Sequence, residues 1–439
     1  MFGGRKQKQV EPRQAPDDAQ ADERVLIHLD SRLAQNQALI ERVGDAVTPR
    51  AVESLPANFR RLPTARAVFA LYPDMQTLTR LAEAVRTQRE ARGDGLPVLV
   101  VALEPAELTE FGGWLAEAAR SDRIHGLRLI VDRDPDAAVT LLGEHLDPVT
   151  EPNIIAMPVS TEVETREYKY FFCLSPQLRG LLSYLTELAE NNISRIYLLG
   201  GPGAGKTSLA YYYYLSRQQG NFVTVNLTAE ATDDKAAMKS LLCGHVSGAF
   251  PGAGSRTGAF SHARDGVAFL DESHGVSGSV MEVLMEALDS NQYLPYGASA
   301  KRPLECAVVF ASNRNWDTLI ASINMDEHAR LGAMIMHLPD LAVRREDLIA
   351  VLAATLDNMR QRTTSWTAPA GLSDAAWQAV CDCPWRGNTR ALIRVIETAF
   401  VTAASRRAPL IERDAIDDAL LLWEPESHAS HAIYTSAGG

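Results

Sequence analysis

The sequence predicts an α/β protein made of two successive α/β units followed by a group of helices. Short apolar runs alternate with longer helical stretches over residues 24–148 and again over residues 176–340. This alternation is typical of parallel sheets that are covered by helices. Further helical stretches follow over residues 341–424. The length of 439 residues agrees with several domains, at roughly 150 residues each.

Composition places the chain among ordinary globular proteins, with 46% hydrophobic and 22% charged residues. The net charge of −12 provides no overall attraction to nucleic acid or to anionic membranes. The five cysteines are scattered and odd in number, which favours a reducing compartment over a disulfide framework. No apolar run is long enough to span a bilayer, and residues 1–22 lack the apolar core of a signal peptide. We therefore expect a cytoplasmic protein without membrane contact.

The first unit begins after a polar stretch, residues 1–23, that we expect to be disordered. Helices are expected near residues 32–43, 74–91, 105–120 and 135–146. A weak extra strand near residues 46–52 would bring the strand count to five. The other four strands are apolar runs, namely Val25–Leu29, Ala67–Leu71, Val98–Leu103 and Leu127–Val131.

Residues 24–148 loosely resemble a flavodoxin-like response-regulator receiver domain. A receiver needs carboxylates at the strand ends to hold magnesium and accept a phosphoryl group. Asp30 is one candidate acid, but Phe69 stands where the phosphoacceptor Asp is expected. The fifth strand ends in Val131-Asp132-Arg133, without the usual Lys. We therefore expect a degenerate receiver-like regulatory domain that serves packing or partner contact.

Residues 149–175 are mostly polar and are expected to form a linker. A second α/β unit is expected over residues 176–340. Helices near residues 344–361, 373–381, 388–404 and 411–423 form a separate helical domain over residues 341–424, and residues 425–439 form a tail.

A glycine-rich loop lies between a strand and a helix in the second unit. The apolar run Arg195–Leu199 leads into G-x-x-x-x-G-K-T, and a helical stretch, residues 208–215, follows. Glycines in this setting let backbone N–H groups surround phosphates, and the helix N-terminus adds partial positive charge. Lys206 supplies a charge for the β- and γ-phosphates, and the Thr207 hydroxyl is a magnesium ligand. The expected nucleotide-binding residues are Gly200, Gly201, Pro202, Gly203, Ala204, Gly205, Lys206, Thr207 and Ser208.

Two further strands of this unit end in polar residues. The run Val267–Leu270 ends in Asp271 and Glu272. Asp271 suits a water-mediated magnesium contact, and Glu272 suits polarisation of the attacking water. The strand over residues 307–312 ends at Asn313, whose amide can detect the γ-phosphate. Together with the loop, these residues predict hydrolysis of Mg-ATP.

These residues resemble the AAA+ ATPases and, within them, the sigma-54-dependent transcription activators. Residues 242–253, L-C-G-H-V-S-G-A-F-P-G-A, resemble the family's L-F-G-H-E-K-G-A-F-T-G-A, the loop that engages the sigma factor. A-S-N-R-N at 311–315, L-P-D-L at 338–341, R-R-E-D-L at 344–348 and W-R-G-N-T-R at 385–390 also match family motifs. The resemblance covers about residues 175–423. It implies an AAA+ α/β domain with a helical lid, assembled in a hexameric or similar ring.

The resemblance also implies roles for single residues. Asn226 matches the Asn that restrains the catalytic Glu. Arg330 matches an arginine that is inserted into the neighbouring subunit's nucleotide site, and Arg390 matches the lid arginine that detects bound nucleotide. The expected client is sigma-54 RNA polymerase, and the loop that contacts it consists of Gly248, Ala249, Phe250, Pro251, Gly252 and Ala253.

The sequence departs from the family at three places. Pro251 replaces the Thr of G-A-F-T-G-A, which removes a hydroxyl and fixes φ. Asn324 stands where a second inter-subunit Arg is often found. The residues after Trp423 are too few and not basic enough for the family's helix-turn-helix, so we expect no direct DNA binding, and action from solution or through a DNA-binding partner protein.

Two alternatives stay open from the sequence alone. The ATPase can act on a client other than the sigma factor, or the ring can be an adaptor that responds to nucleotide with little turnover. Intact Lys206, Thr207, Asp271 and Glu272 argue against the adaptor. Cys381 and Cys383 are too close together for a tetrahedral zinc site, and no second pair accompanies them.

Overall fold

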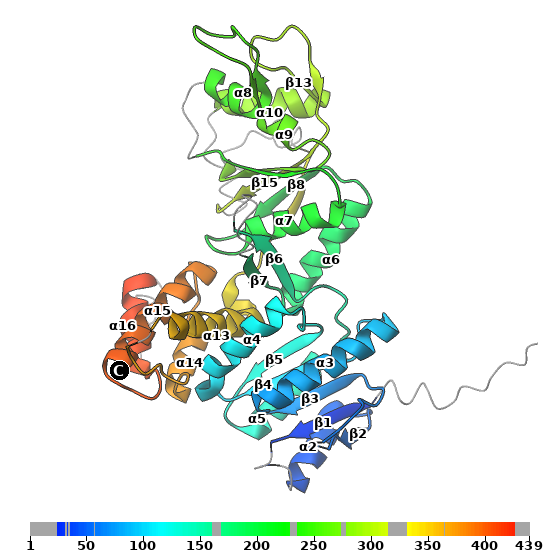
Figure 1. Cartoon of the computed structure of the whole chain (residues 1–439), viewed down its shortest axis with the longest axis vertical. Coiled ribbons are helices and arrows are strands. Elements are labelled where there is room, and N and C mark those ends of the chain that lie inside the picture. The colour runs from blue at the N-terminus through cyan, green and yellow to red at the C-terminus, as the bar shows by residue number, and fades with distance from the viewer. Residues whose placement is uncertain are drawn as a thin grey trace, which may run out of the picture. The chain divides into compact units, whose positions relative to one another are not determined.

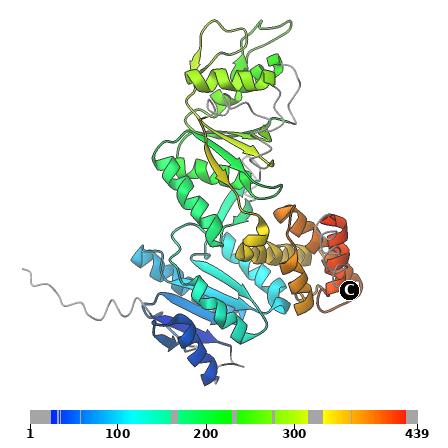
Figure 2. The same cartoon turned by 180° about the vertical axis from the view of Figure 1, so that it is seen from behind.

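The computed structural model describes residues 24–30, 33, 36–56, 58–159, 168–228, 235–273, 278–314, 332–363 and 365–425. The chain divides into two compact units (Figures 1 and 2). The first unit comprises residues 1–104 and 123–150, and the second comprises residues 105–122 and 151–439. In the described part of the chain, no helix combines the length and apolarity needed to cross a membrane.

A five-stranded parallel sheet forms the centre of the first unit. Its strand order, β2-β1-β3-β4-β5, is the flavodoxin-like order 2-1-3-4-5. This confirms the flavodoxin- and receiver-like fold that the sequence predicts. The strands are β1 (Val25–Leu29), β2 (Val52–Ser54), β3 (Ala67–Leu71), β4 (Val98–Leu103) and β5 (Leu127–Val131).

The helices of the first unit begin at polar caps. Asp74 accepts a hydrogen bond from the Thr77 amide (2.8 Å) at the start of α3 (Met75–Arg92). α2 (Gln37–Val47) and α5 (Pro135–Leu142) are capped in the same way by Asn36 and Asp134. The strand expected near residues 46–52 was wrong in position, because Leu39, Val43 and Val47 recur every four residues on one buried face and continue α2 to Val47.

The carboxyl end of β3 lacks the phosphoacceptor of a receiver. Phe69 is fully buried in β3, with an exposed fraction of 0%. The nearby carboxylate of Asp74 is occupied as a helix cap, which lowers its pKa, chiefly through the hydrogen bond from the Thr77 amide. These placements agree with the expectation of a degenerate site.

The second unit also contains a five-stranded parallel sheet, of order β16-β8-β15-β12-β9. Because all five strands are parallel, their carboxyl ends meet at one edge, where α/β proteins bind ligands. The strands are β8 (Arg195–Leu199), β9 (Phe222–Asn226), β12 (Val267–Asp271), β15 (Ala307–Ser312) and β16 (Met334–His337).

Helices cover both faces of this sheet, so its central strands are largely apolar, whereas Thr224 of the edge strand β9 and Met334 of the edge strand β16 are exposed. Val267 and Phe269 of β12 belong to the buried cluster that contains α6 (Pro176–Glu190) and α7 (Lys206–Arg217). Ala268 and Leu270 point into the opposite cluster. The helices on that side are α8 (Lys235–Cys243), α9 (Ala259–His262) and α10 (Gly278–Ser290).

Three small antiparallel strand pairs complete this α/β domain. One of them, β6 (Ile154–Pro158) with β7 (Tyr168–Phe172), lies in the segment for which the sequence predicts a linker. The other two pairs are β10 (Gly244–His245) with β11 (Arg256–Thr257), and β13 (Gln292–Tyr293) with β14 (Arg302–Pro303).

The lid is helical, as expected. It begins with the 3-10 turn η4 (Leu341–Val343) and continues through α13 (Arg345–Arg362), α14 (Asp374–Asp382), α15 (Asn388–Ser405) and α16 (Arg413–Trp423). The second unit also includes η1 (Pro105–Glu107), which lies against α14, and α4 (Leu108–Arg120), which packs along α13 (Figures 1 and 2). The chain thus enters α4 from β4 of the first unit and leaves it toward β5.

Candidate functional site

A pocket of about 270 Å³ lies at the carboxyl edge of the second sheet. It is lined by residues from the glycine-rich loop, from the ends of β12 and β15, and from the lid helix α15. Six residues predicted from the sequence to act in catalysis or metal and nucleotide binding line it together, namely Lys206, Thr207, Asp271, Glu272, Asn313 and Arg390. Pro202, Gly203, Gly205 and Ser208 also line it, as predicted.

Two glycines of the loop hold conformations that other residues adopt only with strain. Gly203 has φ +72° and Gly205 has φ +110°. Space is also restricted, since a Cβ on Gly205 would lie 2.3 Å from the ring of Phe171. Phe171 comes from β7 and lines the pocket, although no sequence motif singled it out. Phe171 and Ile393 are the large apolar side chains of the lining.

Lys206 is folded back onto its own loop. Its Nζ donates hydrogen bonds to the carbonyl oxygens of Gly200 (2.8 Å) and Gly201 (3.1 Å). Burial lowers its pKa, while the carboxylate of Asp271 acts in the opposite direction. The side chain therefore lines the pocket, where it can exchange these carbonyls for phosphate oxygens.

Asp271 and Glu272 follow β12 directly, as predicted. The Glu272 backbone is left-handed, with φ +53°, and its amide donates to Oδ1 of Asp271 (2.9 Å). A left-handed Glu is uncommon, and such strain concentrates at functional sites. The turn separates the two carboxylates, so that both line the pocket.

Asn226 lies beside Asp271 in the register of β9 and β12. Its Oδ1 accepts hydrogen bonds from the amide (3.0 Å) and the hydroxyl (2.9 Å) of Thr228. The same Thr228 hydroxyl is hydrogen-bonded to Oε2 of Glu272. Sequence reasoning missed Thr228, because a single Thr two residues after a strand carries no recognisable signal.

The lid contributes two neighbouring residues to the pocket. Arg390 lines it from the first turn of α15. Thr389 also lines it, and its hydroxyl donates to the Gly203 carbonyl oxygen (2.7 Å). Thr389 was missed, although it directly precedes Arg390 in the motif at residues 385–390. The preceding residue, Asn388, is fully buried and accepts a hydrogen bond from the Leu341 amide (2.8 Å).

Some of the predicted residues lie elsewhere. Three residues of the loop do not line the pocket, namely Gly200, Gly201 and Ala204. The carbonyl oxygens of Gly200 and Gly201 accept hydrogen bonds from Lys206. Arg330, predicted to act in a neighbouring subunit, and Asn324 are outside the described residues. No cluster of three or more His, Cys, Asp or Glu side chains suited to a metal occurs among the residues that the structure describes.

The predicted partner loop, residues 248–253, is an exposed turn. The Ala253 amide donates to the Phe250 carbonyl oxygen (2.9 Å), and Gly252 has φ +80°. A type II turn requires a positive φ at its third position, which favours glycine, and proline is common at its second position. Pro251 therefore fits this tip conformation. The Phe250 side chain is 44% exposed beside His245 and Tyr296.

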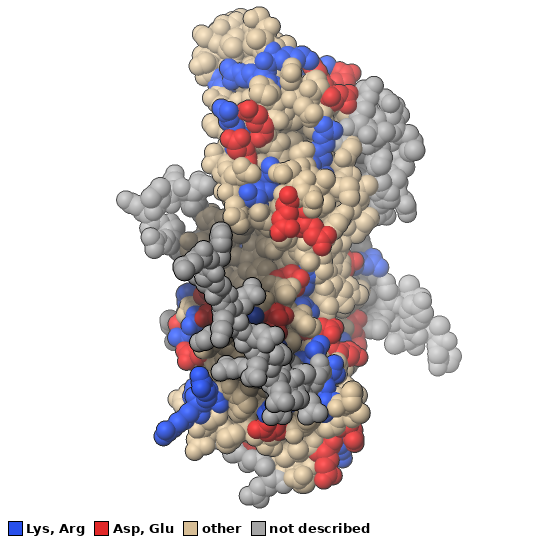
Figure 3. All heavy atoms as spheres, turned by 90° about the vertical axis from the view of Figure 1, so that its right-hand side faces the viewer, with Lys and Arg blue, Asp and Glu red and all other residues tan. Residues whose placement is uncertain are grey.

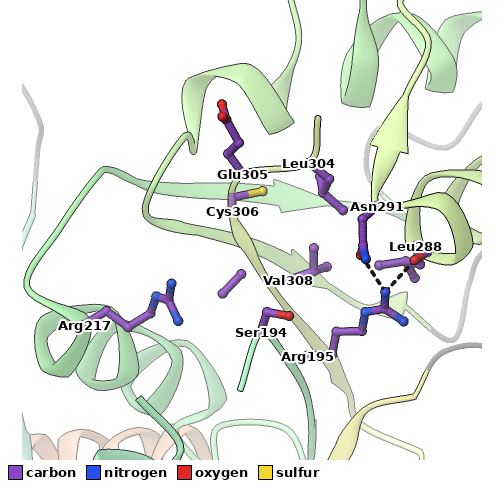
Figure 4. A pocket seen from close by; sticks show the side chains of 10 residues that line it. Ser194, Arg195, Arg217, Leu288, Asn291, Leu304, Glu305, Cys306 and Val308 are labelled. Carbon is purple, nitrogen blue, oxygen red and sulfur yellow. Dashed lines mark hydrogen bonds between the residues drawn. The ribbon is translucent and has the colours of Figure 1, made fainter. Parts of the chain in front are cut away.

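A second pocket, of about 140 Å³, lies at the amino-terminal ends of β8 and β15 (Figure 4). Arg195 there donates to the Leu288 carbonyl oxygen and to Oδ1 of Asn291 (2.9 Å). Arg217 and Cys306 also line this pocket. It contains none of the predicted site residues and faces away from the edge where the glycine-rich loop begins.

Charged side chains occur in small interspersed groups on the face shown in Figure 3. Lys and Arg form a short band near the top of this face, and elsewhere among the described residues they lie in small groups with Asp and Glu.

Comparison with known proteins matches a domain family to the part of the chain that holds most of the pocket. Residues 172–336 match the family model described as the Sigma-54 interaction domain. A Geobacillus stearothermophilus protein named limonene hydroxylase is 33% identical over 223 residues, which cover 49% of this chain and 40% of that protein. The Nif-specific regulatory protein of Herbaspirillum seropedicae is 30% identical over 223 residues, which cover 50% of this chain and 40% of that protein.

The crystal structure of NtrX from Brucella abortus superimposes on 90% of this chain and 84% of its own, with a TM-score of 0.48 and 18% identity. The chain spans less than half the length of the two curated relatives described above. The matched domain contains the glycine-rich loop, the Asp271-Glu272 strand and the partner loop. Residues 172–336 of this chain are therefore a Sigma-54 interaction domain.

Proposed function

We propose that this protein binds and hydrolyses Mg-ATP and uses the cycle to remodel sigma-54 RNA polymerase through residues 248–253. The observation that carries this proposal is the convergence of Lys206, Thr207, Asp271, Glu272 and Arg390 on one pocket. A glycine-rich loop alone shows only that phosphate can bind. A glycine-rich loop that shares a pocket with two carboxylates and a lid arginine suits γ-phosphate cleavage.

Different residues of the pocket bind the phosphates, activate the water and detect the nucleotide. Backbone amides of the loop and Lys206 bind the phosphates, and Lys206 balances charge that develops on the γ-phosphoryl oxygens. Glu272 orients the attacking water and takes its proton. Asn313 and Arg390, from the sheet and the lid, contact the γ-phosphate side and make lid position depend on the nucleotide.

Magnesium suits the donor set at this site. The Thr207 hydroxyl and the Asp271 carboxylate line the same pocket, and magnesium prefers a few oxygen ligands together with waters and phosphates. Thr207 would hold the ion directly and Asp271 through water. When bound, the ion neutralises phosphate charge.

We propose that Arg330 completes the site of a neighbouring subunit, so that turnover requires a hexameric or similar ring in the cytoplasm. A guanidinium supplied in trans makes hydrolysis depend on assembly. The domain limits proposed for this protein are a regulatory domain at 24–148, an ATPase domain at 176–340 and a lid at 341–424.

The test is ATP turnover measured over a range of protein concentrations. Turnover per chain should rise with concentration, and Glu272→Gln should lower it by about a hundredfold or more while nucleotide still binds. Glu190→Gln, at an exposed position that ends α6, is the matched control. A wild-type chain that binds nucleotide without turnover at any concentration would favour the adaptor.

A second candidate keeps the ATPase but changes the client. It is favoured by the Pro251-Gly252 turn, which presents no hydroxyl at the loop tip. Capture of the sigma-54 factor with ADP–aluminium fluoride separates the two candidates. A complex formed by wild type supports the sigma factor as client, whereas a complex formed only by Pro251→Thr supports another client.

We further propose that the N-terminal domain regulates the ATPase through α4. Gly112 allows α4 to lie directly on α13, since a Cβ there would be 2.0 Å from the Ala353 carbonyl oxygen. The Thr109 hydroxyl donates to the carbonyl oxygen of Pro369 (2.9 Å), and the Leu372 amide donates to that of Pro105 (3.0 Å). Because α4 is continuous with β4 and β5 of the other unit, it is suited to restrain the lid.

Gly112→Val tests this regulation. It should displace α4, increase hydrogen exchange along α13 and raise basal turnover several-fold. Gly180→Ala, at an exposed α6 position with no atom within 4 Å of the added Cβ, is the control. Increased exchange with unchanged turnover would show that α4 only packs against the lid.

A further inference from the structure

Four buried polar side chains gather where the lid joins the ATPase domain. Their exposed fractions are 0% for Cys173, 1% for Ser175, 0% for Arg344 and 2% for Asp347. Arg344 and Asp347 belong to the motif at residues 344–348, to which the sequence comparison assigned no role. Charged groups are almost never buried to this extent unless they serve a specific interaction.

Arg344 connects the lid to the phosphate loop. It occupies the N-cap of α13, and its Nη2 donates to the Ala204 carbonyl oxygen (3.2 Å). Ala204 lies between the two positive-φ glycines of the loop. Fixing its carbonyl also fixes the peptide group that Ala204 shares with Gly205, a residue that lines the pocket.

Asp347 connects the same helix to the start of the ATPase domain. Its Oδ1 accepts hydrogen bonds from the amides of Leu174 (2.6 Å) and Ser175 (3.2 Å). In return, the Asp347 amide donates to Oγ of Ser175 (3.3 Å). Ser175 is the N-cap of α6, so these bonds join the first turn of α13 to the first turn of α6.

The two charges act on each other. Burial raises the pKa of Asp347 to about 6, and Arg344 is the strongest influence in the opposite direction. Burial lowers the pKa of Arg344, and Asp347 is the strongest influence opposing that shift. Nε and Nη1 of Arg344 and Oδ2 of Asp347 have no hydrogen-bond partner among the described residues. Each charge thus favours the ionised form of the other.

We propose that Arg344 and Asp347 form a charged joint that positions the phosphate loop for nucleotide from the root of the lid. Arg344 is the positioning residue for the loop through its bond to Ala204, and Asp347 fixes α13 to α6 through its bonds to Leu174 and Ser175. The inference rests on the proposed nucleotide binding at the pocket. The bond from Arg344 to Ala204 is a further contact between the lid and the loop. Unlike Thr389 and Arg390, Arg344 does not line the pocket.

Positioning and simple core stability predict different results for two variants. Arg344→Met removes the bond to Ala204 and leaves Asp347 without its counter-charge. It should weaken ADP binding about tenfold or more, because hydrogen bonds from charged groups are the stronger ones. Arg344→Met with Asp347→Leu removes both charges, and replacing a buried pair by apolar residues is often neutral for stability.

The experiment measures melting temperature and ADP affinity for both variants, together with KM and kcat for ATP. The double variant should recover the melting temperature while ADP affinity stays at least about tenfold weaker, and KM should rise more than kcat falls. Arg179→Met is the control, since Arg179 is 6% exposed and donates to the Leu174 carbonyl oxygen (3.2 Å) at the same junction. Its ADP affinity should change less than threefold.

Wild-type ADP affinity in the folded double variant would overturn the inference, because the pair would then serve stability alone. Should the double variant not fold, Arg344→Met alone, assayed below its melting temperature, serves the same purpose, because wild-type ADP affinity without the bond to Ala204 would also overturn the inference. Absence of ADP binding by the wild-type chain would instead contradict the proposed function itself, so the two failures are distinguishable.

Discussion

The hydroxyl of Thr228 is hydrogen-bonded to Oε2 of Glu272 and also lies 2.9 Å from Oδ1 of Asn226. A hydroxyl has one proton, so it can donate to only one of these oxygens at a time. Thr228 therefore stands between the Asn that the sequence predicts as the restraint and the Glu that it is predicted to restrain. The segment that follows leads to α8 and then to the partner loop.

We expect Thr228→Val to raise basal ATP turnover several-fold. The substitution keeps the shape of the side chain but removes the donor that holds the Glu272 carboxylate toward β9. A hydrogen bond to a charged group is worth about 1.5–3 kcal/mol, and each 1.4 kcal/mol is tenfold, so a tenfold rise is within reach. Steady-state phosphate release measures the effect.

Thr228→Ser retains the hydroxyl and should keep wild-type turnover. Lower turnover in Thr228→Val, with wild-type nucleotide affinity, would contradict the restraint. It would show that the hydroxyl instead holds Glu272 in its working position.

Gly205→Ala should weaken nucleotide binding by about tenfold or more. Its φ of +110° is unfavourable for alanine, and the new Cβ would meet the Phe171 ring at 2.3 Å. A fluorescent ADP titration measures the loss. The double variant with Phe171→Ala removes the contact but not the backbone strain, so recovery should be partial. Full recovery would mean that only the ring contact matters.

Local patterns in the sequence predicted the sheets and the centre of the site. Strands β1, β3, β4 and β5 have the predicted bounds, because buried parallel strands are continuous apolar runs between polar segments. The phosphate loop and Asp271-Glu272 were predicted because their chemistry is concentrated in a few consecutive residues. The pocket brings these separate motifs together at one sheet edge.

Features that depend on tertiary contacts were not predictable. Phe171 and Thr228 act on residues far away in the sequence, and neither belongs to a motif. α4 follows β4 in a flavodoxin-like pattern, yet it packs on α13, because glycines at residues 112 and 113 permit a close approach that no local propensity specifies. The strand β2 was misplaced because a three-residue edge strand leaves little periodicity to detect.

Thr389→Val should raise the KM for ATP about two- to tenfold and leave kcat nearly unchanged. The hydroxyl donates to the Gly203 carbonyl oxygen (2.7 Å), and a neutral hydrogen bond is worth about 0.5–1.5 kcal/mol. Steady-state kinetics at saturating magnesium measure both constants, with Thr389→Ser as the conservative control. A fall in kcat at constant KM would place the contact in the transition state instead.

Asp347 should make the stability of the second unit depend on pH near neutrality. Burial raises the pKa of its carboxyl to about 6, against the opposing influence of Arg344 and of the amides of Leu174 and Ser175, while Glu346 adds to the rise. Burial raises the pKa of the Cys173 thiol, and the nearby charge of Asp347 raises the pKa of that thiol further.

The folded chain therefore keeps a proton on Asp347 up to about pH 6, whereas the unfolded chain releases it near pH 4. The proton thus stabilises the folded chain at low pH, and this stabilisation is lost as pH rises through 6. Asp347→Asn keeps the acceptor for the two amides but cannot titrate. The unfolding free energy of wild type relative to Asp347→Asn should fall by about 1.3 kcal/mol between pH 5 and 7. Urea unfolding followed by tryptophan fluorescence measures this difference, and a difference that grows with pH would mean that the ionised carboxylate is the stabilising form.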